Sequence, residues 1–135
     1  MVQNTQRDQR RAADFVKRYN PPRIFGDFKW KHVVTVEQFE RADLDILFKV
    51  ATSLRRRVAS HDPDVSQLAR GYLMASLFFE ASTRTDLSFQ AAMRRLGGEV
   101  ITPSGGVQFS SVYKGENLAD TVRAAACYAD VIALR

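Results

Sequence analysis

A short polar stretch, Ser82-Thr83-Arg84-Thr85, combines three hydroxyl groups with one permanently charged guanidinium. It follows an apolar run that ends at Phe79, and it opens a stretch with helical periodicity. The free N–H groups of a helix's first turn point at one spot and carry a partial positive charge. Hydroxyls and an arginine fork at that spot suit phosphate oxygens. The stretch therefore predicts an anion site; the alternative is a Ser/Thr helix cap beside a solvent-facing arginine.

Strands and helices are expected to alternate around this stretch. The apolar run over 72–79 is typical of a strand buried on both faces. It is followed by a predicted helix over 83–96 that stops at Gly97-Gly98, a strand over 99–102, a loop over 103–115, a helix over 116–129 and a strand over 131–134. This order predicts an α/β fold, a parallel sheet with crossover helices in three layers.

The last residue, Arg135, directly follows the last predicted strand. In an open α/β sheet, ligands bind just past the carboxyl ends of the strands. Arg135 therefore stands where a residue of the anion site is expected.

An earlier helix is expected from a capping-box pattern, Thr35-x-x-Gln38, to about Val58. Three arginines, 55–57, lie at its carboxyl end, where cations suit the helix dipole. A phosphate-binding patch is the alternative interpretation of this triplet.

Charge and composition narrow the function classes. Residues 1–31 contain eight basic and three acidic side chains, whereas residues 32–135 contain twelve of each, so the net charge of +5 lies in the amino-terminal segment. We predict a basic tail and linker over 1–31, a neutral domain over 32–135, and no nucleic-acid partner; a nucleic-acid binder acting through the tail is the alternative.

The only cysteine, Cys127, excludes a disulfide framework and a cysteine-built zinc site, and it fits a cytoplasmic location.

Other common signatures do not occur in the sequence. No stretch has the 18 or so consecutive apolar residues of a membrane span, so no membrane partner is expected. Neither G-x-x-x-x-G-K-[ST] nor G-x-G-x-x-G is present, which argues against an ATP or NAD site.

The segment 78–85, Phe-Phe-Glu-Ala-Ser-Thr-Arg-Thr, resembles the carbamoyl-phosphate signature of the aspartate and ornithine carbamoyltransferases. The similarity covers roughly 32–135 and includes, in matching order, the segments 32–35, 87–89, 95–98, 109–111, 114–116 and 118–121 and the strand that ends at Arg135. The segment 110–116, Ser-Ser-Val-Tyr-Lys-Gly-Glu, favours the aspartate branch over the ornithine branch.

The resemblance implies a role for each matching residue. Ser82, Thr83, Arg84 and Thr85 would hold the phosphate of carbamoyl phosphate, Thr85 would also reach its carbonyl oxygen, and Arg135 would bridge both groups. Arg84, Thr85 and Arg135 are the expected catalytic residues. Ser110 and Lys114 would serve the site of a neighbouring subunit. No metal and no organic cofactor is implied.

The resemblance also implies parts that lie outside these 135 residues. In the family, a second domain binds L-aspartate, and a His-Pro-x-Gln segment supplies the histidine that polarises the carbonyl. We therefore expect the carbamoyl-phosphate half of a two-domain transferase, a homo-oligomer (a trimer by resemblance), inactive as this chain alone. His32 and His61 are expected at the surface or in structural roles. The alternatives are a non-catalytic binding or assembly module of the same fold, or an ornithine carbamoyltransferase-like protein.

Asp86 departs from the family pattern, which usually has arginine at this position. One interpretation places its negative charge against the phosphate and opposes binding. The other uses Thr83-x-x-Asp86 as a capping box that stabilises the start of the helix.

Overall fold

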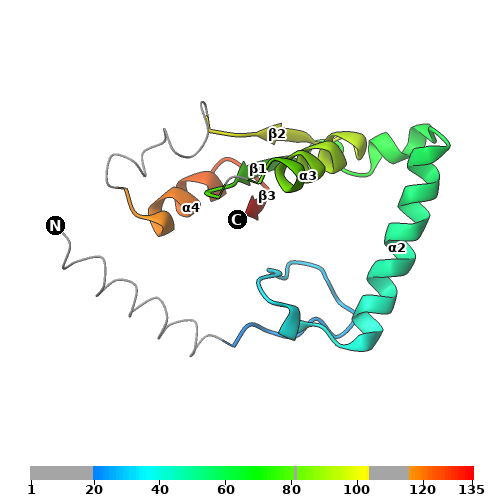
Figure 1. Cartoon of the computed structure of the whole chain (residues 1–135), viewed down its shortest axis with the longest axis horizontal. Helices are drawn as coiled ribbons and strands as arrows, with labels where there is room; N and C mark the ends of the chain where they lie inside the picture. Colours follow the sequence, from blue (N-terminus) through cyan, green and yellow to red (C-terminus); the bar gives the residue numbers. More distant parts are fainter. Residues whose placement is uncertain (1–19, 81, 104–115) are drawn as a thin grey trace. The chain divides into compact units, whose positions relative to one another are not determined.

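The computed structural model of this chain describes residues 20–80, 82–103 and 116–135, which fall into two compact units divided between Ser53 and Leu54. The first unit contains the 3-10 helix η1 (Val36–Gln38) and the first part of helix α2 (Arg41–Ala59). The second contains the rest of α2, the 3-10 helix η2 (Pro63–Gln67), strands β1 (Leu73–Leu77), β2 (Glu99–Ile101) and β3 (Val131–Leu134), and helices α3 (Thr83–Arg95) and α4 (Leu118–Ala126) (Figure 1).

The three strands form one parallel sheet in the order β2-β1-β3. Met74 of β1 pairs with Val100 on one side and Val131 on the other. The predicted parallel α/β fold is therefore confirmed, and β1 is its central strand. Its last four residues are buried, as expected for a strand covered on both faces.

The connections run to opposite sides of β1. Helix α3 joins β1 to β2 at one edge and packs on both strands, whereas the connection that contains α4 returns past β1 to β3. Crossovers between parallel strands are almost always right-handed. Connections to opposite sides of one strand therefore place α3 and α4 on opposite faces of the sheet, which gives three layers.

The turn between α3 and β2 depends on a glycine, as the predicted helix stop at this position suggested. Gly97 has a φ of +88°, in the left-handed region, and a Cβ atom at this position would lie 1.7 Å from the carbonyl oxygen of Ser66. Backbone conformation and space both exclude a larger residue. The carbonyl oxygen of Leu96 accepts a hydrogen bond from the N–H of Ala69 at 2.7 Å, which holds the turn close to η2.

The first unit is organised by the buried side chain of Gln38. Its Nε2 donates to the carbonyl oxygens of Pro22 (3.0 Å) and His32 (2.8 Å), and its Oε1 accepts from the N–H groups of Val34 and Thr35. Together with Thr35 it forms the predicted capping box. The capping box begins the three-residue η1 instead of the long predicted helix, because η1 ends at Gln38 and α2 begins three residues later at Arg41.

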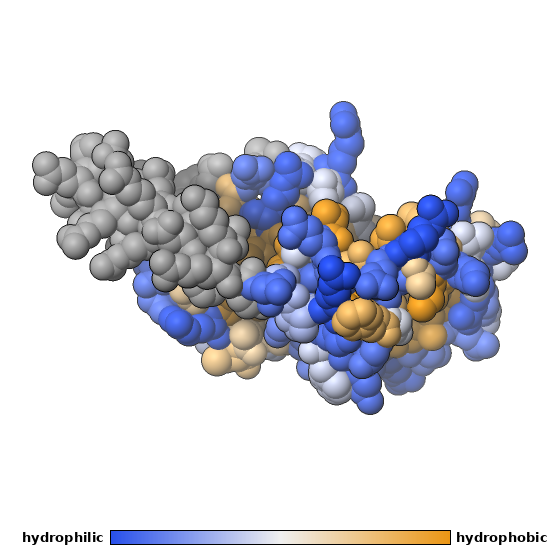
Figure 2. All heavy atoms as spheres, turned by 90° about the horizontal axis from the view of Figure 1, so that it is seen from below, coloured by the Kyte–Doolittle hydropathy of each residue, from blue (hydrophilic) through white to orange (hydrophobic). Residues whose placement is uncertain are grey.

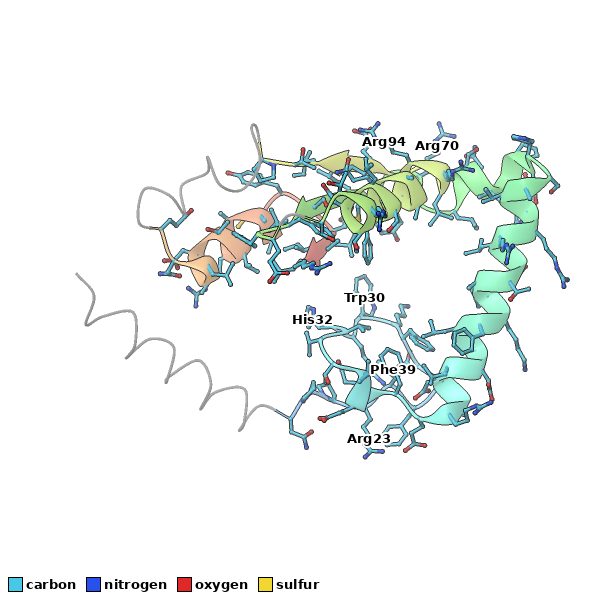
Figure 3. The ribbon with its side chains drawn as sticks, in the orientation of Figure 1. Arg23, Trp30, His32, Phe39, Arg70 and Arg94 are labelled. Atoms are coloured by element: carbon cyan, nitrogen blue, oxygen red, sulfur yellow. The ribbon has the colours of Figure 1, made fainter. Side chains whose placement is uncertain are left out.

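Residues 20–31, which the sequence assigns to the tail and linker, carry long-range contacts within this unit. Ile24 is fully buried, and its N–H donates to the carbonyl oxygen of Gln38 at 3.0 Å. Phe39, labelled in Figure 3, packs against Phe28 with ring centroids 6.3 Å apart. The division of the chain at residue 31 stays a prediction.

A buried carboxylate, that of Asp43, closes the start of α2. Its Oδ2 accepts from the N–H of Glu40 at 2.8 Å, and its Oδ1 accepts from the N–H of Gly26. The hydrogen bond from Glu40 is the main cause that holds the pKa of Asp43 below its ordinary value; burial opposes it, and Gly26, Phe25 and Lys31 add to the lowering. Asp43, the third residue of α2, thus satisfies the N–H of Glu40, the residue that immediately precedes the helix, and ties the segment around Gly26 to the helix start.

Apolar side chains also reach the surface. Trp30 and Phe48 are among the large exposed ones, and Figure 2 shows hydrophobic residues interspersed with hydrophilic ones on one face. Among the helices that the structure describes, none has the length and apolar character needed to cross a membrane.

Replacing Asp43 by asparagine is expected to lower stability at neutral pH, because one carboxylate oxygen becomes an amide nitrogen facing an N–H donor. Since the pKa is depressed in the folded chain, the stabilisation by Asp43 is complete above its ordinary pKa of 3.8. It is lost as the pH falls through the folded value. The difference in urea midpoint between wild type and Asp43→Asn should therefore be largest near pH 7 and shrink below pH 4.

The matched control is Asp45→Asn, an exposed carboxylate on the same helix whose ion-pair partner among the described residues is Arg41 at 3.3 Å. This variant should shift the midpoint little at either pH. A difference for Asp43→Asn that is the same at pH 7 and pH 3 would contradict the assignment.

Candidate functional site

The carboxyl ends of β1 and β3 lie side by side and continue as a ladder beyond the strands. The N–H of Arg135 donates to the carbonyl oxygen of Leu77 at 3.0 Å, and the N–H of Phe79 donates to the carbonyl oxygen of Arg135 at 2.7 Å. The strand order reverses at this point, because the chain leaves β1 toward β2 and returns to its other side as β3. Such switch points are where open α/β sheets bind ligands.

Two predicted site residues meet directly at this switch point. Nη1 of Arg135 donates to Oγ of Ser82 at 2.7 Å, which joins residues 53 positions apart in the chain. Ser82 is the residue before the first turn of α3, with φ −144° and ψ 64°. Its hydroxyl makes no capping bond to the helix, so it serves Arg135 instead.

The first turn of α3 presents its N–H groups beside this pair. The first intrahelical hydrogen bond runs from the N–H of Asp86 to the carbonyl oxygen of Ser82 at 2.9 Å. The N–H groups of Thr83, Arg84 and Thr85 precede that bond, and they carry the partial positive charge of the helix end. The helix N-terminus, the Ser82 hydroxyl and the Arg135 guanidinium thus form one electropositive, donor-rich corner.

The predicted ligands differ in their exposure. Ser82 and Thr85 are half-buried, whereas Thr83 and Arg84 are exposed on the first turn of α3. Ser110 and Lys114, predicted to serve a neighbouring subunit, lie outside the described residues. His32 and His61 are both exposed, as expected. Within the described ranges, no group of three or more His, Cys, Asp or Glu side chains is placed to hold a metal ion.

An acidic residue that the sequence did not single out belongs to the same corner. Oε2 of Glu80 lies 3.2 Å from Nε of Arg135, and the two side chains form an ion pair. Glu80 therefore neutralises part of the positive charge that would attract an anion. The sequence could have indicated this ion pair. Glu80 and Arg135 each lie no more than three residues after a predicted parallel strand, and the carboxyl ends of such strands meet at one edge of the sheet.

Asp86 does not form the capping box predicted from the sequence, whereas the effect of its charge on a bound anion stays a prediction. The residue that caps α3 is Ser82, not Thr83, so Thr83-x-x-Asp86 does not form a capping box. The Asp86 carboxylate accepts hydrogen bonds from Oγ of Ser76 on β1 at 2.6 Å and from Nε2 of Gln90 on α3 at 2.8 Å. It thus binds a side chain of the sheet and one of its own helix, because a buried strand hydroxyl needs an acceptor.

The sequence of this chain matches carbamoyltransferases over most of its length. Residues 31–135 match the family model described as aspartate/ornithine carbamoyltransferase, carbamoyl-P binding domain. The chain is 55% identical over 108 residues to the multifunctional protein pyr-3 of Neurospora crassa, covering 80% of this chain and 6% of that protein. It is 49% identical over 108 residues to aspartate carbamoyltransferase 2, chloroplastic, of Pisum sativum, covering 80% of this chain and 28% of that one.

The fold matches solved structures of the same kind. Aspartate transcarbamoylase from Trypanosoma cruzi, solved in complex with carbamoyl phosphate, superimposes with a TM-score of 0.74 at 41% identity. The match covers 87% of this chain and 36% of the trypanosomal chain. The present chain therefore spans about a third of the trypanosomal chain and less than a third of the pea protein.

Replacing Glu80 by glutamine should tighten the binding of inorganic phosphate by the chain about two- to fivefold, the range expected for one exposed ion pair. The amide oxygen can still accept from Nε of Arg135, so the guanidinium stays in place while the competing charge is removed. Calorimetric titration with phosphate at low salt measures the change.

The control is Glu99→Gln, which makes the same substitution at the exposed first residue of β2, at the amino end of the sheet. Unchanged or weaker phosphate binding by Glu80→Gln would show that Glu80 does not compete with the anion for Arg135.

Proposed function

Because the chain belongs to the carbamoyl-phosphate-binding domain family of the aspartate and ornithine carbamoyltransferases, we propose that it is the carbamoyl-phosphate half of an aspartate carbamoyltransferase. The observation that carries this proposal is the hydrogen bond between Arg135 and Ser82 beside the N-terminus of α3. It joins two predicted ligands at the switch point of the sheet. The aspartate branch is preferred because the pea relative is named an aspartate carbamoyltransferase and the trypanosomal one an aspartate transcarbamoylase.

The proposed reaction transfers a carbamoyl group from phosphate to an amine. The amine nitrogen of L-aspartate attacks the carbamoyl carbon, a C–N bond forms, and the bond from that carbon to the bridging phosphate oxygen breaks. Inorganic phosphate leaves with the bonding electron pair, the nitrogen loses a proton, and N-carbamoyl-L-aspartate is the product. This is an early step of pyrimidine synthesis.

The residues of this chain act on the phosphate side of that reaction. Ser82, Thr83, Arg84 and Thr85 donate to the phosphate oxygens, and Arg135 bridges the phosphate and the carbonyl oxygen. Negative charge grows on the phosphate as the bond breaks, so fixed donors and cations stabilise the transition state. They also orient the carbamoyl carbon for attack. L-Aspartate would bind through a second domain.

The non-catalytic alternative drew support from Asp86, whose charge stood where the family usually has arginine. Its carboxylate is engaged by Ser76 and Gln90, so it has structural partners and its presence does not by itself favour the non-catalytic alternative. A homotrimer and a cytoplasmic location belong to the same proposal; the pea relative is named chloroplastic.

Replacing Arg84 by alanine should weaken the binding of carbamoyl phosphate and of inorganic phosphate about ten- to hundredfold, the range for a hydrogen bond to a charged group. Arg84→Lys should recover little, because an ammonium group cannot make a two-pronged contact. Calorimetry measures affinity, and the melting temperature checks the fold.

Arg94→Ala is the matched control, an exposed arginine in the last turn of the same helix (Figure 3). It should leave phosphate affinity unchanged. Equal affinity of wild type and Arg84→Ala would overturn the proposed site.

The proposed contribution of Lys114 to the site of a neighbouring subunit can be tested in a chimaera. The chimaera carries residues 31–135 in place of the matching domain of the trypanosomal enzyme. The 135-residue chain alone should show no carbamoyl transfer, because the aspartate domain is needed, whereas the chimaera should be active. Arg84→Ala and Lys114→Ala chimaeras should each be inactive, and their mixture should recover activity through hybrid sites. No recovery after verified subunit exchange would contradict the role of Lys114 in a neighbouring site.

A further inference from the structure

We propose that Ser76, Asp86 and Gln90 form an anchor that holds the first turn of α3 at the carboxyl end of β1 and thereby positions the anion site. These are positioning residues, since their side chains bind one another. The proposal rests on the proposed function for the identity of the anion.

Two hydrogen-bond donors converge on one oxygen of Asp86. Oγ of Ser76 and Nε2 of Gln90 both bind Oδ1, at 2.6 Å and 2.8 Å. Ser76 is 3% exposed, so its hydroxyl depends on this acceptor. The hydrogen bond between Ser76 and Asp86 therefore links the buried central strand to α3. Gln90, one turn further along α3, holds the Asp86 carboxylate in place with a second hydrogen bond.

Asp86 is linked to the anion site by its backbone as well. Its N–H donates to the carbonyl oxygen of Ser82, while its side chain reaches Ser76. Ser76 in turn pairs with Ala133, two residues before Arg135. The chain of contacts from Ser82 through Asp86 and Ser76 to β3 thus closes on Arg135, whose Nη1 returns to Ser82 Oγ at 2.7 Å.

This closed series of contacts explains how the anchor would support anion binding. A displacement of the first turn of α3 by one ångström would lengthen the Ser82–Arg135 hydrogen bond beyond its normal range. It would also shift the N–H groups of residues 83–85 relative to the guanidinium, so the two sets of donors would no longer converge on one anion. Holding donors in place before the ligand binds is a major source of affinity and rate in such sites.

The decisive comparison uses two variants of equal charge. Asp86→Asn keeps an Oδ1 that can accept from both Ser76 and Gln90, whereas Asp86→Ala removes the acceptor. We expect Asp86→Asn to bind inorganic phosphate at least as tightly as wild type, and Asp86→Ala to bind it about three- to tenfold more weakly than Asp86→Asn, the range of one net hydrogen bond.

Ser76→Ala tests the other end of the anchor without changing any charge. It should weaken phosphate binding by the same factor, and the double variant Ser76→Ala/Asp86→Asn should be no weaker than Ser76→Ala alone. The control is Ser60→Ala, which likewise removes a serine hydroxyl but one that donates to a backbone carbonyl oxygen, that of Arg57 at 3.0 Å. Its phosphate affinity should equal that of wild type.

Amide hydrogen exchange of the ligand-free chain supplies a readout that needs no anion. In Ser76→Ala and Asp86→Ala, the residue-86 amide should exchange several-fold faster than in wild type, whereas amides in the last turn of α3 should be unchanged. Asp86→Asn should restore the wild-type rate.

The outcomes separate the two proposals. Equal tightening by Asp86→Asn and Asp86→Ala would mean that Asp86 acts through its charge alone, and an unchanged residue-86 exchange rate in Ser76→Ala would mean that no anchor exists; either result overturns the inference. A wild-type chain that binds neither phosphate nor carbamoyl phosphate would overturn the proposed function, and the exchange rates would still decide the anchor.

Discussion

The parallel ladder between β1 and β3 determines where the predicted anion-binding residues of this chain lie. It aligns Leu77 with Leu134, so the residues that follow the two strands leave the sheet at the same edge. The backbone of Arg135 extends the ladder through Leu77 and Phe79. Without this register, the side chains of Ser82 and Arg135 would not lie close enough to form a hydrogen bond. The site is therefore a consequence of strand pairing first and of side-chain chemistry second.

Local patterns in the sequence predicted the second unit well. The apolar run over 72–79, the helix opened by Ser82 and the strand over 131–134 all occur as expected, because each has strong periodicity and clear ends. The order β2-β1-β3 follows from contacts between distant segments, which no local pattern contains. The first unit was harder, since the capping box at Thr35 begins a three-residue 3-10 helix, which ends at the buried Gln38, and not the long predicted helix.

Within the candidate site, too, local residue types can be predicted from the sequence, whereas contacts between distant residues cannot. Hydroxyls and an arginine at a helix start indicate an anion site from residue types alone. The partners of Glu80 and Asp86 depend on which side chains the fold brings near, namely Arg135 and Ser76. A hydroxyl in an otherwise apolar strand was the available signal for Asp86, because a buried Ser76 must find an acceptor. Asp86 supplies that acceptor, and Gln90, four residues further along the same helix face, also donates to it.

Arg135 is ordered by the protein itself, since Ser82 and Glu80 hold two of its guanidinium nitrogens. An unrestrained arginine side chain carries about 2 kcal/mol of rotamer entropy, which it loses when it is fixed. In this chain that loss accompanies folding, so an anion that takes over the guanidinium exchanges one set of oxygens for another and does not have to immobilise the side chain. Recognition at the proposed site would accordingly be a substitution between rival acceptors, and its selectivity would depend on how much better a tetrahedral dianion fits the arginine than a single carboxylate does.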